Sequence, residues 1–88
     1  MKKIFETGQI VITANAQSTL NEEDIQIALD RHLRGDWGES MDAETNDVAV
    51  ENGNERILSV YRDCNNTKFW IITEADRSAT TILLPQDY

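Results

Sequence analysis

The spacing of apolar positions along the 88-residue chain predicts one clear helix over residues 21–34. One face of this segment carries Ile25, Ala28, Leu29, His32 and Leu33. Asn21 precedes an acidic first turn, and Gly35 follows the last turn, which are typical signals for the start and the end of a helix. The pattern therefore favours a main amphipathic helix that packs its apolar face on the rest of the domain.

Four other segments are rich in β-forming residues. Residues 8–14 predict an N-terminal strand, and an antiparallel β-meander is predicted over residues 56–62, 68–73 and 80–84. Residues 69–72 are apolar on both faces, as is typical of a central strand that is covered on each side. One face of the sheet should meet the helix. The other face needs the N-terminal segment, a second helix or another subunit to cover it.

A second, shorter helix is predicted over residues 42–52, with Asp42 as its cap and Gly53 as its end. Its apolar face is narrow. The chain has no internal repeat and no linker, and its length suits one small domain over residues 1–88. The predicted fold class is α+β.

Charge is concentrated in one part of the chain. The formal net charge is −8, and residues 36–55 contain seven acids and no base. These acids are Asp36, Glu39, Asp42, Glu44, Asp47, Glu51 and Glu55. Such a band repels phosphates, so direct binding to nucleic acid is disfavoured. It suits the basic surface of a partner protein or could imitate a phosphate backbone, although acids also simply keep a small protein soluble.

Cysteine usage and the absence of long apolar runs indicate where the chain acts. Cys64 is the single cysteine, so an internal disulfide is impossible and a cytoplasmic location is expected. Residues 6–9 interrupt any apolar core of a signal peptide. No apolar run approaches the ~20 residues that a membrane-spanning helix needs.

The segment RHLRGDWGE, residues 31–39, is the first candidate for chemistry. Gly35 and Gly38 bracket Asp36 and Trp37, so the chain turns sharply there and presents a large ring. Trp37 either anchors the loop to the core or stacks on a partner. His32 has no second histidine or cysteine at metal-ligand spacing, so neither a metal nor a cofactor is predicted.

The second candidate is the polar island of residues 73–81 between two apolar runs. Asp76 or Ser78 could bond back to the backbone, and Glu74 could pair with Arg77, which are structural roles. Those roles explain each residue singly. They explain less well why so many hydrogen-bonding groups gather in one hairpin.

Catalysis has weaker support. A metal-free ribonuclease would need a base, cations and a hydroxyl, which could come from His32, Arg56, Arg62, Arg77 and Ser78 or Thr81. The acidic composition argues against this alternative. The chain has no Gly-x-Ser-x-Gly motif and no glycine-rich phosphate loop, so an enzyme is left open but is not favoured.

The blocks RHLRGDWGE and WIITEADRSATTILLP resemble a family of small uncharacterised bacterial proteins whose genes are often labelled "plasmid-related". The resemblance extends from about Gly8 to Tyr88. The family has no established activity, so the resemblance implies no catalytic residue. It implies a bacterial source, an association with mobile elements and a chain that stands alone as one domain.

The resemblance includes several polar residues that packing alone would not need. We hypothesise that the end of the main helix and the 73–81 hairpin come together, with Asp36 or Asp76 bonded to Arg31 or Arg77. The resulting candidate interaction patch consists of Arg31, His32, Asp36, Trp37, Glu74, Asp76, Arg77 and Thr81. The favoured function is a protein-interaction or accessory module linked to mobile elements. The alternatives are a nucleic-acid mimic and the ribonuclease-like protein.

Overall fold

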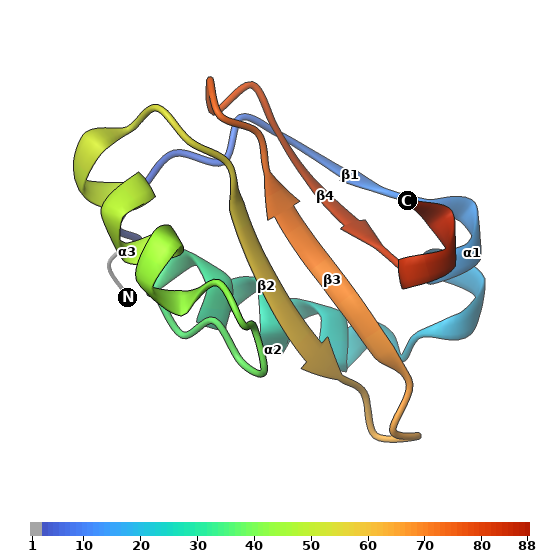
Figure 1. Ribbon diagram of the computed structural model, residues 1–88. Coiled ribbons are helices and arrows are strands. Elements are labelled where there is room, and N and C mark those ends of the chain that lie inside the picture. Colours follow the sequence, from blue (N-terminus) through green and yellow to red (C-terminus); the bar gives the residue numbers. More distant parts are fainter. Residues whose placement is uncertain (1–2) are drawn as a thin grey trace.

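The computed structural model describes residues 3–88 and has the predicted α+β architecture, with a four-stranded mixed sheet and three helices (Figure 1). In chain order the elements are β1 (Gln9–Ile12), α1 (Ala14–Thr19), α2 (Glu22–Leu33), α3 (Ala43–Asn52), β2 (Ile57–Arg62), β3 (Lys68–Thr73), β4 (Ala79–Leu83) and the 3-10 turn η1 (Pro85–Asp87).

The strand order in the sheet is β1-β4-β3-β2. Strands β2, β3 and β4 form the predicted antiparallel meander, and each lies within one residue of its expected bounds. β1 joins the sheet beside β4 and runs parallel to it, which makes the sheet mixed. The N-terminal strand therefore extends the sheet sideways and does not cover its second face.

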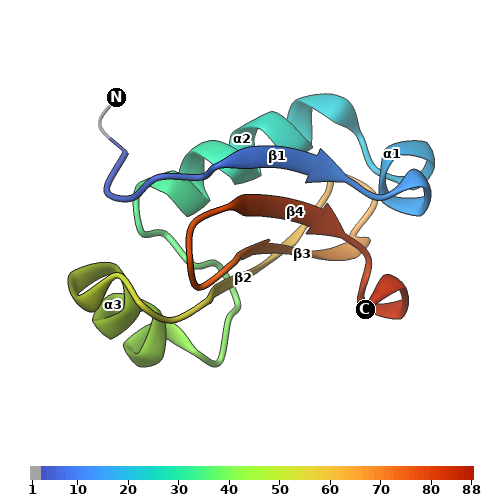
Figure 2. The ribbon, with the colours of Figure 1, turned by 90° about the horizontal axis from the view of Figure 1, so that it is seen from above.

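Helix α2 covers one face of the sheet, as expected (Figure 2). Its start is capped as predicted, because the Asn21 side chain accepts a hydrogen bond of 3.2 Å from the Asp24 amide. Beneath the helix lies the main core, which consists of Ala16, Leu20, Ile25, Ala28, Tyr61, Phe69, Ile71, Ile82 and Leu84. No helix within residues 3–88 has both the length and the apolar character to cross a bilayer.

The predicted strand over residues 8–14 is too long, and a helix was missed after it. The Thr13 hydroxyl accepts a hydrogen bond of 3.1 Å from the Ala16 amide, which ends β1 and starts α1. Ala16 is the only buried residue of this six-residue helix. A helix that buries one alanine leaves no apolar repeat in the sequence, so its pattern could not be distinguished from a strand end.

The second predicted helix is confirmed as α3, but Asp42 does not cap it with its side chain. Instead, the Ser40 hydroxyl accepts a hydrogen bond of 3.1 Å from the Asp42 amide. Gly53 ends the helix as predicted, with a left-handed φ of 72°. The Asp42 carboxylate is consequently free for other contacts.

Two groups of hydrogen bonds satisfy the outer edge of β2, one from a side-chain amide and one from a backbone segment. The Asn46 side-chain amide donates to the Leu58 carbonyl at 2.7 Å, and its oxygen accepts from the Leu58 amide at 3.1 Å. Further along, the Val60 amide donates to the Trp37 carbonyl, and the Glu39 amide donates to the Val60 carbonyl at 2.8 Å. Strand β2 therefore has no free edge between Leu58 and Val60, where unpaired backbone groups would invite aggregation.

Replacing Asn46 with alanine is expected to lower the free energy of unfolding by about 2 kcal/mol, because it leaves the Leu58 amide without a partner. The Leu58 carbonyl keeps the Ser40 hydroxyl, which donates to it at 2.8 Å. Asn46 is 1% exposed, so water cannot readily replace its amide. Urea unfolding followed by circular dichroism measures the loss. The control is Asn52→Ala at the exposed end of the same helix, which should change stability by less than about 0.5 kcal/mol. Equal losses in both variants would contradict the role of Asn46.

Candidate functional site

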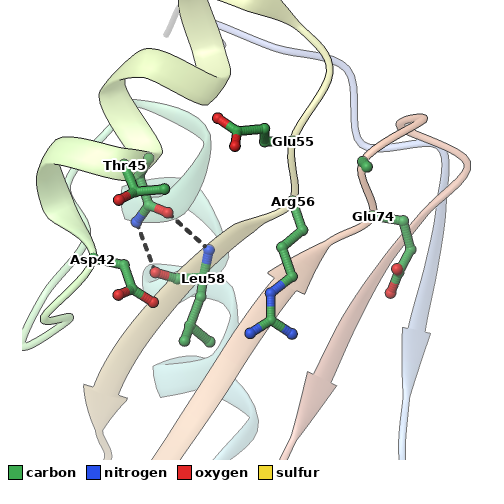
Figure 3. Close-up of a pocket in the computed structure, with 8 residues that line it drawn as sticks. Asp42, Thr45, Glu55, Arg56, Leu58 and Glu74 are labelled. Atoms are coloured by element: carbon green, nitrogen blue, oxygen red, sulfur yellow. Dashed lines mark hydrogen bonds between the residues drawn. The ribbon is translucent and has the colours of Figure 1, made fainter.

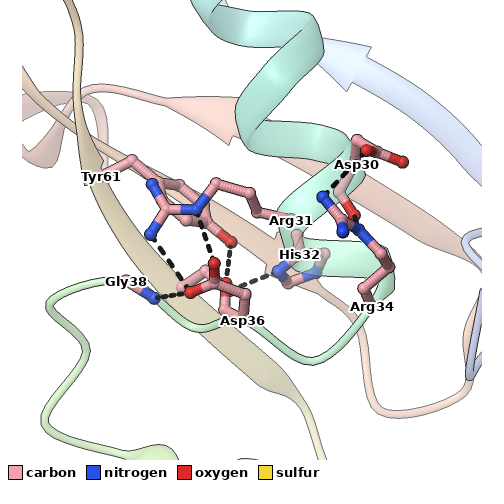
Figure 4. Close-up of polar contacts among 8 residues, drawn as sticks. Asp30, Arg31, His32, Arg34, Asp36, Gly38 and Tyr61 are labelled. Carbon is pink, nitrogen blue, oxygen red and sulfur yellow. Dashed lines mark hydrogen bonds and ion pairs between the residues drawn. The ribbon is translucent and has the colours of Figure 1, made fainter.

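The end of α2 forms one of the predicted ion pairs. The Arg31 guanidinium donates to the two Asp36 carboxylate oxygens at 2.8 and 3.1 Å and lies 4.8 Å from the centre of the Tyr61 ring (Figure 4). The hydrogen bond from Arg31 lowers the pKa of Asp36, and the same bond raises the pKa of Arg31. Both side chains are partly exposed, so the pair fixes the loop after α2 and contributes at most about 1 kcal/mol.

His32 lies inside the protein at one end of a buried chain of hydroxyl groups. Its Nε2 lies 2.9 Å from the Thr73 hydroxyl, Thr73 lies 2.8 Å from the Thr80 hydroxyl, and Thr80 donates to the Thr7 carbonyl. A carbonyl only accepts, so each hydroxyl must donate toward Thr7 and the His32 Nε2 must carry a proton. The Nδ1 atom then accepts from the Ser59 hydroxyl.

Burial keeps this imidazole neutral. His32 is 0% exposed, and burial lowers its pKa to about 3. The rings of Phe5 and Trp37 meet the imidazole edge-on, with ring centres 5.2 and 5.8 Å away. A sealed imidazole of this kind has no route to a substrate, so the geometry does not suit the role of general base in the ribonuclease alternative.

Trp37 is an anchor of its loop. Its ring is 6% exposed and belongs to a second core cluster with Phe5, Ala49 and Ile57. The indole Nε1 donates to the Asp47 carboxylate at 2.9 Å, which ties the loop to α3. Of the two roles considered from the sequence, the structure therefore shows anchoring.

The polar island is organised around Arg77, whose backbone has a left-handed φ of 61°. Its guanidinium donates to four backbone carbonyls, those of Ala49, Glu55, Glu74 and Ala75. The Asp76 carboxylate accepts from the Ser78 amide at 3.0 Å, the back-bonding predicted from the sequence. Arg77 thus holds the hairpin against the end of α3, and no ion pair joins it to Asp36 or Asp76 within residues 3–88.

The helix end and the hairpin are therefore joined inside the protein, through His32, Thr73 and Thr80, and not through an exposed cluster of charges. Glu74 and Thr81 are the members of the predicted patch that lie on the surface described next. The binding role of the full patch stays a prediction.

An acidic cleft of about 510 Å³ lies between α3, the start of β2 and the hairpin (Figure 3). It is lined by Asp42, Thr45, Asn46, Glu55, Arg56, Leu58, Glu74 and Ala75. Figure 3 shows Asp42 on one side of Leu58, Arg56 and then Glu74 on the other side, and Glu55 above Arg56. Within residues 3–88 none of these three carboxylates forms an ion pair. The cleft therefore holds three unpaired acids against one base.

The cleft continues onto the face of the sheet that α2 does not cover, which we call the open sheet face. Strand register places Arg62, Lys68 and Ala79 on this face. It also places six further side chains of β2, β3 and β4 there: Leu58, Val60, Trp70, Ile72, Thr81 and Leu83. Ile72 and Leu83 are buried, whereas the other four remain partly exposed. A hollow of about 350 Å³ on this face has Trp70 and Val60 in its wall and shares Asp42 and Leu58 with the acidic cleft.

Tyr88 lies across one side of this face. Its ring centre is 5.7 Å from that of Trp70, and its hydroxyl accepts a hydrogen bond of 2.6 Å from Arg56. Tyr88 is nevertheless 74% exposed. Two aromatic rings and an arginine thus stand together at the surface, and these residue types are enriched where proteins bind proteins.

Sequence reasoning included Asp42 and Glu55 in the acidic band but assigned no binding role to Trp70 or Val60. The signal that could have found them is the alternation within β2 and β3, which puts Val60 directly opposite Trp70. Residue types alone cannot show which part of this face stays open, because the path of α3 decides it.

No group of three or more His, Cys, Asp or Glu side chains within residues 3–88 is placed to hold a metal ion. The free Cys64 is exposed on the turn between β2 and β3. The chemistry that this surface offers is therefore charge and apolar contact.

These features define a small α+β domain with one covered and one open sheet face. A scan against models of protein families, a search of curated proteins and a search of solved structures each found no match.

Proposed function

We propose that this protein is an interaction module that binds a basic, partly apolar segment of another protein through the acidic cleft and the open sheet face. The observation that carries the proposal is the continuity of the two surfaces. Three unpaired carboxylates lie beside a mainly apolar hollow, whose wall also contains Glu39 and Lys68, and Asp42 and Leu58 belong to both surfaces. A partner segment with lysines or arginines at one end and apolar side chains at the other would match both parts.

The two parts of this surface would contribute in different ways. Burying the exposed parts of Trp70, Val60 and Leu58 would supply affinity at about 25 cal/mol per Å² of apolar area, less the cost of association. The carboxylates would mainly speed the encounter with a basic partner and reject acidic ones. Binding should consequently weaken as ionic strength rises.

The cellular setting of the proposal comes from the sequence. The resemblance of residues 31–39 and 70–85 to plasmid-related bacterial proteins supports a role linked to mobile elements. The single cysteine supports a cytoplasmic partner.

Mimicry of nucleic acid has less support than protein binding. Among the seven acids of residues 36–55, Asp36 and Glu39 are paired with arginines and Asp47 accepts from Trp37. A phosphate mimic needs its charges free and regularly spaced on one surface, whereas these three serve the fold.

Site-specific photo-crosslinking tests the proposal. A benzophenone amino acid in place of Trp70 should capture a discrete partner in cells of the source organism, and the captured peptide should be basic. The same group in place of Ile27, which is 59% exposed on α2, is the control for the opposite side of the sheet. We expect capture at position 70 and not at position 27.

Charge reversal separates specific binding from general attraction to an acidic protein. The double variant Glu55→Lys, Glu74→Lys should lose the partner by at least about tenfold. The double variant Glu23→Lys, Glu51→Lys changes the net charge equally, away from the cleft. Equal capture by both double variants, or equal crosslinking from positions 27 and 70, would overturn the proposed site.

A further inference from the structure

The two edges of the sheet differ. The edge formed by β2 is closed by Asn46 and by residues 37–39, as described above. The edge formed by β1 pairs only with β4 on its inner side, and Figure 2 shows it as the outermost strand. Long or apolar open edges are usually protected by charges, proline or a covering segment. β1 has none of these: it is Gln-Ile-Val-Ile, and no other strand within residues 3–88 pairs with its outer side.

The register shows which backbone groups face outward. The amides of Gln9 and Thr13 donate to the carbonyls of Ser78 and Ile82 in β4, both at 3.0 Å. Since the backbone groups of successive residues alternate in direction along a strand, the N–H and C=O groups of Ile10 and Ile12 point away from the sheet. These two residues present four hydrogen-bonding groups to another strand.

A groove runs beside this edge, between β1 and α2, and Gln17 and Gln26 contribute to its lining. It measures about 250 Å³, and its apolar walls include Ile10, Ile12, Leu20, Ile25 and Leu29. Glu22 is the only charged residue that lines it. Ile10 is 49% exposed and Val11 is 40% exposed. A strand added at the edge would therefore gain both backbone hydrogen bonds and a place for an apolar side chain.

The distribution of charge indicates which strand would pair there. Residues 7–21 contain no charged side chain, although the whole chain carries a net charge of −8. Two copies of so acidic a protein repel each other, and the repulsion is weakest when they meet through an uncharged surface. A basic partner, in contrast, would be drawn to the acidic cleft. The charge-free edge thus favours a second copy of this chain.

We propose that β1 is a dimerisation strand that pairs antiparallel with β1 of a second copy. In the twofold arrangement Ile10 of each copy faces Ile12 of the other and exchanges two hydrogen bonds with it, and the two Val11 residues meet at the axis. The two sheets then form one continuous eight-stranded sheet with both α2 helices on the same side. The isoleucine side chains of each copy extend the wall of the other copy's groove.

Sedimentation over a range of protein concentrations tests the dimer. The interface is small, so we expect a dissociation constant of about 10–100 µM. Association should strengthen in about 0.5 M salt, because salt screens the repulsion between the copies. Partner binding at the acidic cleft should weaken under the same conditions, so failure of the dimer and failure of the proposed function are distinguishable.

Two variants locate the interface. Val11→Lys places two like charges at the twofold axis and should weaken association at least about tenfold, whereas Ile27→Lys on the exposed side of α2 should leave it unchanged. Hydrogen exchange gives an independent readout, since the Ile10 and Ile12 amides should become protected only as protein concentration rises. A protein that stays monomeric to about 1 mM, or equal weakening by both variants, would overturn the proposal.

Discussion

Lowering the pH from 7 to 4.5 is expected to reduce the free energy of unfolding by about 2.5 kcal/mol, and His32 is the residue responsible. Burial lowers the pKa of this side chain from its ordinary value of 6.5 to about 3 in the folded protein. Between these two values the unfolded chain binds a proton that the folded protein does not. Stability is therefore complete above pH 6.5 and falls as the pH decreases toward 3.

The hydrogen-bonded chain around His32 explains why the folded protein resists the proton. Nδ1 already accepts from the Ser59 hydroxyl, and Nε2 already donates toward Thr73. A second proton on the ring would face the Ser59 hydroxyl proton and would place a charge between the Phe5 and Trp37 rings. Desolvation of that charge is the larger cost.

His32 is the only histidine in the chain, which makes the measurement clean. Urea unfolding from pH 7 to 4.5 should show the loss in the wild type and little slope in His32→Gln. The carboxylates with lowered pKa values, among them Asp36 and Asp63, add a further loss as the pH falls below about 4. If His32→Gln does not fold, proton NMR of the wild-type imidazole measures the pKa of His32 in the folded protein directly. Ring signals that titrate near pH 6.5 in the folded protein would contradict the prediction.

Local signals in the sequence were enough for most of the fold. Asn21, the acidic turn after it and Gly35 defined α2, because a helix start and end depend on side chains within a few residues. The meander could be predicted from alternation and from the asparagines of the turn between β2 and β3. The place of β1 in the sheet could not be predicted. Nothing in residues 9–12 specifies that the neighbouring strand is β4, about 70 residues away.

The interior of the candidate site depends on long-range contacts that leave no motif. His32 meets Ser59 and Thr73, whose positions in the sequence have no shared spacing with it. The Arg77 guanidinium donates to the backbone carbonyls of residues 49 and 55. Because every residue has a backbone carbonyl, the sequence does not show which ones Arg77 will contact. Residue types suggested an exposed charged patch. The contacts show that most of those residues also support the fold, whereas Glu74 lies in the acidic cleft and Thr81 on the open sheet face.

Substituting Gly38 with alanine is expected to lower the free energy of unfolding by about 4 kcal/mol. Gly38 has a left-handed φ of 65°, which alone costs an alanine about 1–2 kcal/mol. A Cβ at this position would also lie 2.1 Å from the Val60 carbonyl oxygen and 2.8 Å from the Tyr61 ring. The chain would have to move away from β2 to make room.

Gly53 is the matched control for the cost of placing alanine at a left-handed φ. Its φ is 72°, and nothing lies within 4 Å of a Cβ built there, so Gly53→Ala should cost about 1 kcal/mol. Urea unfolding of both variants measures the difference, which isolates the close approach of residues 37–39 to β2. Equal losses would show that this segment shifts at no cost.

The Gly38 variant also connects the fold to the open sheet face. Glu39 follows Gly38, donates its amide to Val60 and stands in the wall of the hollow beside Trp70. Displacing this segment should expose the Val60 amide, which loses the Trp37 carbonyl as its acceptor. In Gly38→Ala under conditions where it stays folded, we expect faster hydrogen exchange at Val60 and weaker partner capture from position 70. Gly53→Ala should retain both properties, because Gly53 touches neither β2 nor the hollow.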